Sequence, residues 1–222
     1  MSKKKNSSKE SGNQSSVKLY AGAGAVIALI AVGIFIFVMN QRAETVDSIN
    51  TVKSAHTESD IHIKGNPNAA NRLIKYSDFG CVFCANQHLL LKQFLEEHGN
   101  DFSLEIKHFP INNNIPSRMA ISAAISAGRQ GMYWDMVDLL YANANEWRSD
   151  PYAALTRYVE VLGLDLDQFT NDMNDEDMMY EVVKNYFAYQ ELGINATPTL
   201  FLNGERIQNP RTYEQLVDQL IK

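Results

Sequence analysis

The chain has 222 residues, of which 45% are hydrophobic and 10% aromatic, enough for one globular domain with a real core. Its 20 basic and 26 acidic side chains give a formal net charge of −6, which argues against nucleic acid as the main partner. With only two cysteines, a framework of structural disulfides is excluded.

The N-terminus combines a basic tail with a long apolar run. Residues 1–18 contain five lysines and one glutamate and predict a disordered segment. Residues 19–39 are uncharged and apolar, and about 20 helical residues span the hydrocarbon core of a bilayer. A buried helix and a cleaved signal peptide are the alternatives, but this run is longer than a signal peptide's apolar region and no small-residue cleavage site follows it. We therefore expect an uncleaved transmembrane anchor.

The charges on either side of this run predict how the chain is oriented. Lysines precede the run and the acidic excess follows it, which places the N-terminus in the cytoplasm by the positive-inside rule. We expect a single-pass protein of the cell membrane with its domain outside the cytoplasm, where a dithiol can be oxidised. Residues 40–64 are polar without sustained periodicity and predict a linker. A turn signal from Gly65 to Asn68 then opens the folded domain, expected over 65–222.

Apolar periodicity and turn residues predict the elements of this domain in order. We expect strands at 70–77, 102–109 and 200–202, helices at 82–98, 176–192 and 212–221, and a helical region from 116 to about 171. Within that helical region, Asp150 and Pro151 have the pattern of a helix start. Gly193 is a candidate helix end, and Asn203-Gly204 predicts a tight hairpin turn.

Cys81 and Cys84 lie between a strand-like run and a helix-like run, with two residues between them. Residues three apart share a face of a helix, so the two thiols can form a reversible disulfide. Free N–H groups and the helix dipole at the start of a helix favour an anion, which predicts a stabilised thiolate at Cys81. A redox-active dithiol is the preferred interpretation; a buried pair of free cysteines or half a zinc site are the alternatives.

Three stretches together resemble the DsbA-like branch of the thioredoxin fold. They run from Ser77 to Cys84, from His108 to Pro110, and from Leu192 to Gly204, the last containing Thr197-Pro198-Thr199. The resemblance covers 65–222 and implies an α/β thioredoxin fold with an inserted helical domain at about 115–185. It also implies that Pro198 is a cis-proline facing the dithiol, and that Thr197 offers backbone hydrogen bonds to an extended substrate.

The resemblance implies different roles for the two cysteines. Cys81 is expected to be exposed and to form the mixed disulfide, and Cys84 to be more buried and to resolve it. Lys75, Asp78 and Phe83 are candidates for tuning the pair. Many relatives have proline after the first cysteine and histidine or tyrosine before the second, where this chain has Val-Phe. DsbA has a buried acid where this chain has Lys75; a lysine near the dithiol would stabilise the thiolate, whereas one pointing to solvent would not.

The implied activity is that of an extracytoplasmic thiol–disulfide oxidoreductase acting on unfolded or reduced secreted proteins. We expect an oxidase, and the alternative is a reductase, for instance in cytochrome maturation. No cofactor is expected. The chain lacks the dimerisation domain of the family's isomerases, which favours a monomer, and a quinone-linked membrane protein is a candidate recycling partner.

A non-enzymatic metal-binding module is the third interpretation. Cys81, Cys84 and His88 can share one face of the helix, but a closed zinc site needs a fourth ligand that the sequence does not supply. His88 is more typical of a packed or surface residue, and we expect no metal. A strand end near the dithiol is one position open to His108, and the sequence assigns no role to His88 or His108.

Overall fold

The structure is a computed structural model that describes residues 32–34, 36–37 and 62–221. The chain divides into two units, residues 1–53 and 54–222. In the first unit, the described residues are helical; the rest of the expected anchor at 19–39, the expected tail at 1–18 and most of the expected linker lie outside the described residues. No helix among the described residues is both long enough and apolar enough to cross a membrane.

The second unit is built on a mixed sheet with the strand order β1-β3-β2-β4-β5. Its central pair, β2 (Asn71–Ser77) and β3 (Phe102–His108), runs parallel with Leu73 opposite Leu104. The other three strands pair antiparallel and are β1 (Ile63–Gly65), β4 (Thr199–Leu202) and β5 (Glu205–Ile207). Because β2 is the middle strand and is hydrogen-bonded on both sides, the loop that follows its C-terminal end starts from a rigid position.

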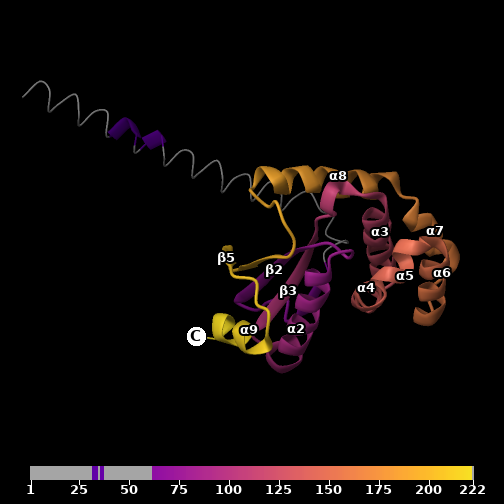
Figure 1. The fold of residues 1–222 in the computed structure, drawn as a ribbon, viewed down its shortest axis with the longest axis horizontal. Helices are drawn as coiled ribbons and strands as arrows, with labels where there is room; N and C mark the ends of the chain where they lie inside the picture. Colours follow the sequence, from indigo (N-terminus) through magenta and orange to yellow (C-terminus); the bar gives the residue numbers. More distant parts are fainter. Residues whose placement is uncertain (1–31, 35, 38–61, 222) are drawn as a thin grey trace, which may run out of the picture. The chain divides into compact units, whose positions relative to one another are not determined.

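Helices cover both faces of this sheet (Figure 1). On one face lie α2 (Val82–His98) and α9 (Tyr213–Leu220), and on the other lies α8 (Glu176–Glu191). Burial of aliphatic and aromatic side chains between the sheet, α2 and α9 forms a core that includes Leu73, Phe94 and Leu200. Every residue of β3 except His108 is buried. This pattern is expected for a strand that is covered on both faces of the sheet.

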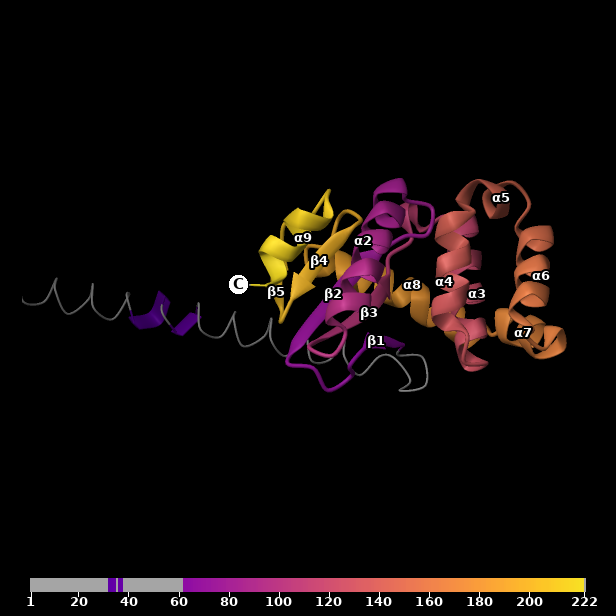
Figure 2. The ribbon, with the colours of Figure 1, turned by 90° about the horizontal axis from the view of Figure 1, so that it is seen from below.

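A block of helices is inserted between β3 and β4. After a single 3₁₀ turn at Ile111–Asn113, it contains α3 (Ile115–Arg129), α4 (Tyr133–Ala142), α5 (Ala144–Ser149), α6 (Pro151–Leu162) and α7 (Leu166–Met173). These helices pack beside the sheet and α2 (Figure 2), around their own core. Trp147 is fully buried there and donates its indole N–H to the carbonyl of Leu140 at 2.8 Å.

The α/β fold class with inserted helices is confirmed, and most element boundaries agree within one or two residues. Asp150 caps α6 by accepting from the N–H of Ala153, with Pro151 in the first turn. Asn203 and Gly204 both have positive φ in the turn between β4 and β5.

The sheet begins earlier than the expected domain start at Gly65. β1 pairs with β3 from Ile63, inside the stretch expected to be linker. A three-residue strand with one large apolar side chain has no alternation to detect, so periodicity could not reveal it.

Candidate active site

A short loop connects β2 to α2, and Asp78 fixes its shape. The buried carboxylate of Asp78 accepts from the N–H of Gly80 and the hydroxyl of Ser117, both at 2.7 Å, and from the N–H of Ile111 at 2.6 Å. Three donors on one carboxylate fix its position, because both of its oxygens are engaged. The side chain proposed to tune the cysteines therefore positions the loop that carries Cys81.

Cys81 is the N-cap residue of α2. Its Sγ accepts from the backbone N–H of Cys84 at 3.4 Å and lies 3.6 Å from the carbonyl oxygen of Thr197. The pKa of Cys81 is lowered to about 6, chiefly by the hydrogen bond with the Cys84 side chain and, against the opposing effect of burial, by Thr197 and the N–H groups of Cys84 and Phe83. The geometry at this helix start therefore favours the thiolate form of Cys81, as expected.

Cys84 lies deeper, one helical turn further on. None of its surface is exposed, against 8% for Cys81. The pKa of Cys84 is raised far above its usual value, first by burial and second by the hydrogen bond with Cys81. The predicted order of exposure holds, but Cys81 is much less exposed than expected, because the segment at Thr197 lies against its sulfur.

The Thr197–Pro198 peptide bond is cis, as the resemblance implied. Asn209 holds this segment by donating from its amide to the carbonyl of Pro198 at 2.6 Å. The amide oxygen of Asn209 accepts from Gln87 of α2 at 3.2 Å, so one side chain connects the proline segment to the cysteine helix. Asn209 belongs to no motif recognised in the sequence, and only the fold brings it to this place.

Lys75 points inward, toward the dithiol. It has no exposed surface, and its Nζ donates to the carbonyl oxygen of Cys84 at 2.8 Å. The same Nζ lies 4.8 Å from the ring centroid of Tyr141, on α4. The solvent-facing orientation of Lys75 considered from the sequence is thus excluded.

Further buried polar groups adjoin this lysine. The hydroxyls of Ser77 and Tyr141 are 2.7 Å apart, and the ring of Tyr141 lies 4.8 Å from that of His88. His88 is joined to Asp138 at 2.6 Å, and Lys92 donates to the other oxygen of that carboxylate at 2.6 Å. Tyr141 and Asp138 gave no signal in the sequence, because both lie in an ordinary amphipathic helix.

His88 therefore faces a carboxylate, whereas the metal-binding interpretation needs it beside the cysteines. Its pKa is lowered, first by burial, so it is neutral around neutral pH. Within residues 62–221 and the few described residues before them, no group of three or more His, Cys, Asp or Glu side chains could hold a metal ion. The metal-binding interpretation thus has no ligand cluster in this part of the chain.

Phe83, between the two cysteines, points into solvent with 73% of its surface exposed. Its side chain cannot tune the sulfurs by contact, and only its backbone N–H acts on Cys81. Beside Cys81 lies an open pocket of about 390 Å³ between the start of α2 and the α4–α5 connection, with Phe79 and Arg148 among its lining residues. An apolar side chain and a pocket thus flank the sulfur that a substrate would reach first.

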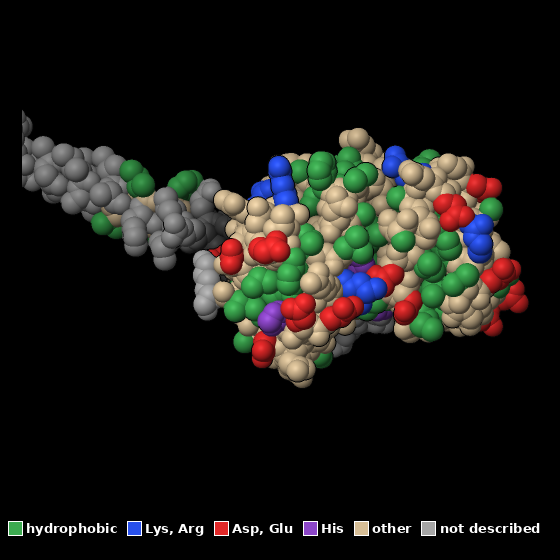
Figure 3. Space-filling view, turned by 60° about the horizontal axis from the view of Figure 1, so that its bottom comes forward, with side chains coloured by type: hydrophobic (Ala, Val, Ile, Leu, Met, Phe, Trp, Pro, Cys, Tyr) green, Lys and Arg blue, Asp and Glu red, His purple; other side chains and the backbone are tan. Residues whose placement is uncertain are grey.

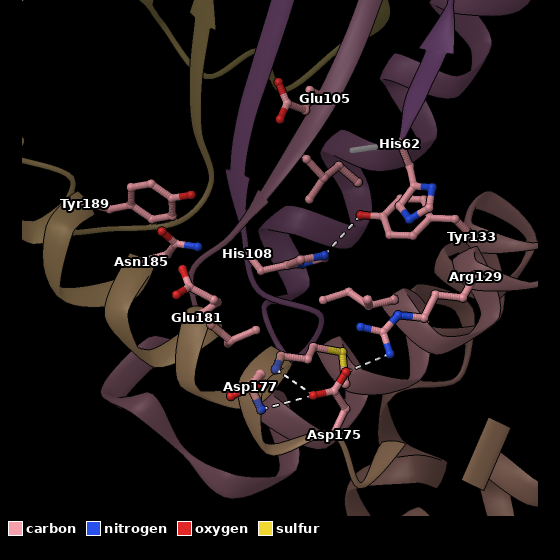
Figure 4. A pocket seen from close by; sticks show the side chains of 14 residues that line it. His62, Glu105, His108, Arg129, Tyr133, Asp175, Asp177, Glu181, Asn185 and Tyr189 are labelled. Atoms are coloured by element: carbon pink, nitrogen blue, oxygen red, sulfur yellow. Dashed lines mark hydrogen bonds and ion pairs between the residues drawn. The ribbon is translucent and has the colours of Figure 1, made fainter. Parts of the chain in front are cut away.

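A second pocket, of about 290 Å³, is lined by residues of β3, α3, α4 and α8 (Figure 4). His108 lines it and is 3.1 Å from the hydroxyl of Tyr133, while Arg129 pairs with Asp175 at 2.9 Å. Neither cysteine lines this pocket. The sequence left the position of His108 open; His108 is the last residue of β3 and lines this second pocket.

One face of the protein shows how the charged side chains are distributed. In the view of Figure 3, acidic side chains form several small groups, and a few lysine and arginine side chains lie among them. This distribution fits the excess of acidic residues in the chain.

Comparison with known families gives a match over residues 56–222 to a family described as thioredoxin. Curated relatives include a Na(+)/H(+) antiporter, NhaA 3, of Salinispora tropica, 32% identical over 156 residues, which are 70% of this chain and 23% of that protein. Another is NhaA 1 of Mycolicibacterium gilvum, 31% identical over 164 residues, 72% of this chain and 26% of that protein. The chain thus spans about a quarter of the length of these relatives.

Solved structures share the fold. The thiol-disulfide exchange protein α-DsbA2 of Wolbachia pipientis superposes with a TM-score of 0.65 at 19% identity, covering 82% of this chain and 96% of that one. Oxidised BdbD of Bacillus subtilis gives 0.62 at 17% identity, covering 74% and 92%. The catalytic domain of ScsC from Proteus mirabilis gives 0.61 at 18% identity, covering 79% and 98%. At these identities the likeness establishes a thioredoxin-like fold with DsbA-like neighbours.

Proposed function

Because the chain belongs to the thioredoxin family, we propose that it is a protein thiol–disulfide oxidoreductase whose redox-active pair is Cys81 and Cys84. The observation that carries this proposal is the unequal placement of the two sulfurs. Cys81 caps α2 beside the cis-Pro198 segment with a pKa lowered to about 6, while Cys84 is buried behind it. Thiol–disulfide exchange needs one sulfur that leaves readily as thiolate and a second that waits to replace it.

The favoured direction is oxidation of client thiols. A low pKa at Cys81 stabilises the reduced form as thiolate, and stabilising the reduced form makes the disulfide a stronger oxidant. The clients are unfolded or reduced secreted proteins, which lie along the Thr197–Pro198 segment as an extended strand. A quinone-linked membrane protein is the proposed partner that restores the disulfide.

The proposed location is the outer side of the cell membrane. It is supported by the apolar run at 19–39 and by the lysines that precede it. Exposing the full chain in membrane vesicles of known orientation to protease tests this point. Protection of the domain in right-side-out vesicles would refute it. Ion exchange is not proposed, because the matched region is only about a quarter of the antiporters.

Two measurements on the full-length protein in detergent micelles test the function. The first follows oxidative refolding of a reduced, multi-disulfide client, and the second determines the equilibrium constant of the pair with glutathione. If the wild-type protein accelerates oxidative refolding of the client and the Cys81→Ser variant does not, the result supports the oxidase. A potential near that of thioredoxin, about −270 mV, with reduction of insulin disulfides, would instead identify a reductase.

A further inference from the structure

The pairing of β4 with β5 stops just short of the cis-proline. Leu200 is the first residue of β4 that pairs with β5, and it lies opposite Ile207. The same register, continued by two residues, would place Asn209 opposite Pro198. The structure makes this contact with a side chain, because the amide of Asn209 donates to the carbonyl of Pro198 at 2.6 Å. The side chain thus extends the connection between the two segments beyond the end of the sheet.

The residue that follows Asn209 prepares it for this contact. Pro210 is buried, and a proline restricts the residue before it to extended backbone conformations, because its ring clashes with a helical one. The backbone of Asn209 is therefore restricted before its side chain forms any hydrogen bond. Less conformational entropy is lost when the amide reaches the proline segment than would be lost by a flexible residue.

The other partner of Asn209 is a buried glutamine. Gln87 has 2% of its surface exposed and lies on α2, one turn after Cys84. Its amide nitrogen donates to the amide oxygen of Asn209 at 3.2 Å, while its own oxygen accepts no hydrogen bond from the described part of the chain. A buried polar group with an unfilled acceptor costs free energy, which an apolar side chain would avoid. Core packing therefore does not account for a glutamine here, whereas the contact with Asn209 does.

This chain of hydrogen bonds encloses the reactive sulfur. At one end, Gln87 belongs to the helix that Cys81 caps. At the other end, Pro198 belongs to the segment whose Thr197 carbonyl oxygen lies 3.6 Å from Sγ of Cys81. The sheet holds the same segment from its other side, because Thr199 pairs with β2. The segment is thus fixed on both sides in the absence of a client.

We propose that Asn209 is a positioning residue that holds the Thr197–Pro198 segment against the cysteine helix, so that the protein reacts with extended polypeptide clients in preference to small thiols. This inference rests on the proposed function, in which the client lies along that segment. A backbone edge that is already ordered binds an extended strand without a further loss of entropy. A small thiol forms no backbone hydrogen bonds and gains nothing from the ordered edge.

The test compares two thiols that react with the disulfide of the oxidised full-length protein in detergent micelles. One is an unstructured peptide with a single cysteine and blocked ends, and the other is mercaptoethanol, which has no peptide bond. Acid quenching and mass spectrometry give both rates over a range of thiol concentrations. Asn209→Ala should lower the ratio of the peptide rate to the mercaptoethanol rate by about tenfold, near the upper end of the net contribution of one hydrogen bond. The loss should lie in the peptide concentration that gives half the maximal rate.

Two further variants identify the contact that acts. Asn209→Asp keeps an oxygen for Gln87 but replaces the donor to Pro198 with a second oxygen, so it should lose as much selectivity as Asn209→Ala. Gln87→Leu removes only the connection to α2 and should lower the ratio by about threefold. Because the contacts lie in series, adding Gln87→Leu to Asn209→Ala should cause no further loss.

Gln208→Ala is the matched control. Gln208 is the adjacent residue, is exposed as Asn209 is, and lies outside this chain of hydrogen bonds. Its replacement should leave the ratio of the two rates within about twofold of wild type. Because both side chains lie at the surface, neither alanine substitution leaves a cavity in the core, and urea denaturation checks that each variant is folded.

An Asn209→Ala ratio within about twofold of wild type overturns the proposal, as does wild-type selectivity in Asn209→Asp or an equal loss in Gln208→Ala. The failure of the proposed function has a different signature. If the wild-type protein forms no Cys81–Cys84 disulfide, or if its disulfide reacts with neither thiol, the proposed function itself fails. If the wild-type protein reacts with both thiols and Asn209→Ala keeps the same ratio, only the role of Asn209 fails.

Discussion

The two sides of the cysteine pair differ in almost every physical respect. On the open side, Cys81 caps a helix and Phe83 projects into solvent beside a pocket. On the closed side, Cys84 has no exposed surface and packs among a buried lysine, tyrosine and histidine. Two cysteines three residues apart thus acquire opposite pKa shifts from one helix turn. The contrast indicates that hydrogen bonds at the helix start lower the pKa of Cys81, whereas burial raises the pKa of Cys84.

Replacing each cysteine with serine gives the largest effect and tests the contrast directly. Cys81→Ser should reduce exchange with any thiol by several orders of magnitude, because no accessible thiolate remains to attack. Cys84→Ser should still react once and then accumulate mixed disulfides with clients, visible on non-reducing gels. Equal behaviour of the two variants would show that the sulfurs are interchangeable.

Alkylation measures the same difference in the unmodified protein. With a pKa of about 6, Cys81 is roughly nine-tenths thiolate at pH 7, so its reaction with iodoacetamide should rise through pH 6 and level off above pH 7. Cys84 should stay unmodified to pH 9, because burial raises its pKa and limits access. Peptide mapping by mass spectrometry separates the two sites. Half-maximal alkylation of Cys81 near pH 9 would contradict the geometry.

The same titration couples to stability. The pKa of Cys81 is lower in the folded chain than the ordinary value of 9.0, so the reduced fold gains stability as pH rises from about 6 to 9 and loses it as pH falls through 6. Cys81→Ser should lack this dependence in urea unfolding. If the unfolding free energy of that variant still rose with pH between 6 and 9, another titrating group would be responsible.

Phe79 and Phe83, two residues before and two residues after Cys81 in the sequence, extend the comparison to packing. Phe79 has 1% of its surface exposed and packs against Tyr141, whereas Phe83 is exposed. Phe79→Ala should lower the free energy of unfolding by about 3–5 kcal/mol, since it leaves a cavity in the core. Phe83→Ala should change it by less than about 0.5 kcal/mol. Urea denaturation of the two reduced variants provides the measurement, and similar losses would refute the assigned burial.

The smallest expected effect concerns Asp138, which contacts His88 and Lys92 beside the buried cysteine. Burial acts to raise the pKa of Asp138, but hydrogen bonds from His88 and Lys92 hold it lower, at about 2. The contribution of this carboxylate is therefore present above about pH 4 and is lost as pH falls through 2. Because Asp138 is partly exposed, Asp138→Asn should cost about 1 kcal/mol or less at pH 7. Asp218→Asn is the control, because Asp218 is exposed. An equal loss of unfolding free energy in both variants would show that the contacts of Asp138 with His88 and Lys92 contribute nothing specific.

The sequence predicted the elements and the pair because both rest on local signals. Helix α2, the Asp150 cap and the Asn203-Gly204 turn depend on residues within a few positions of each other. The strand β1 was missed, because three residues contain too little periodicity.

The depth of the site could not be read in the same way. Whether Lys75 faces solvent or the cysteines depends on α4 and on both neighbouring strands, which lie far away in the chain. Asn209 likewise acquires its role only when the C-terminal segment returns to the cysteine helix. Long-range packing creates these contacts, and neither spacing nor composition records it.

The capping contact at Cys81 has a consequence for how long clients stay attached. The sulfur that reacts is also the acceptor that holds the first turn of α2. Once joined to a client, it bears no negative charge and becomes a poor acceptor, so the complex forgoes a cap that typically contributes about 1 kcal/mol. Discharging the client restores the cap. Loss and recovery of this cap therefore favour release of Cys81 from any mixed disulfide that it forms.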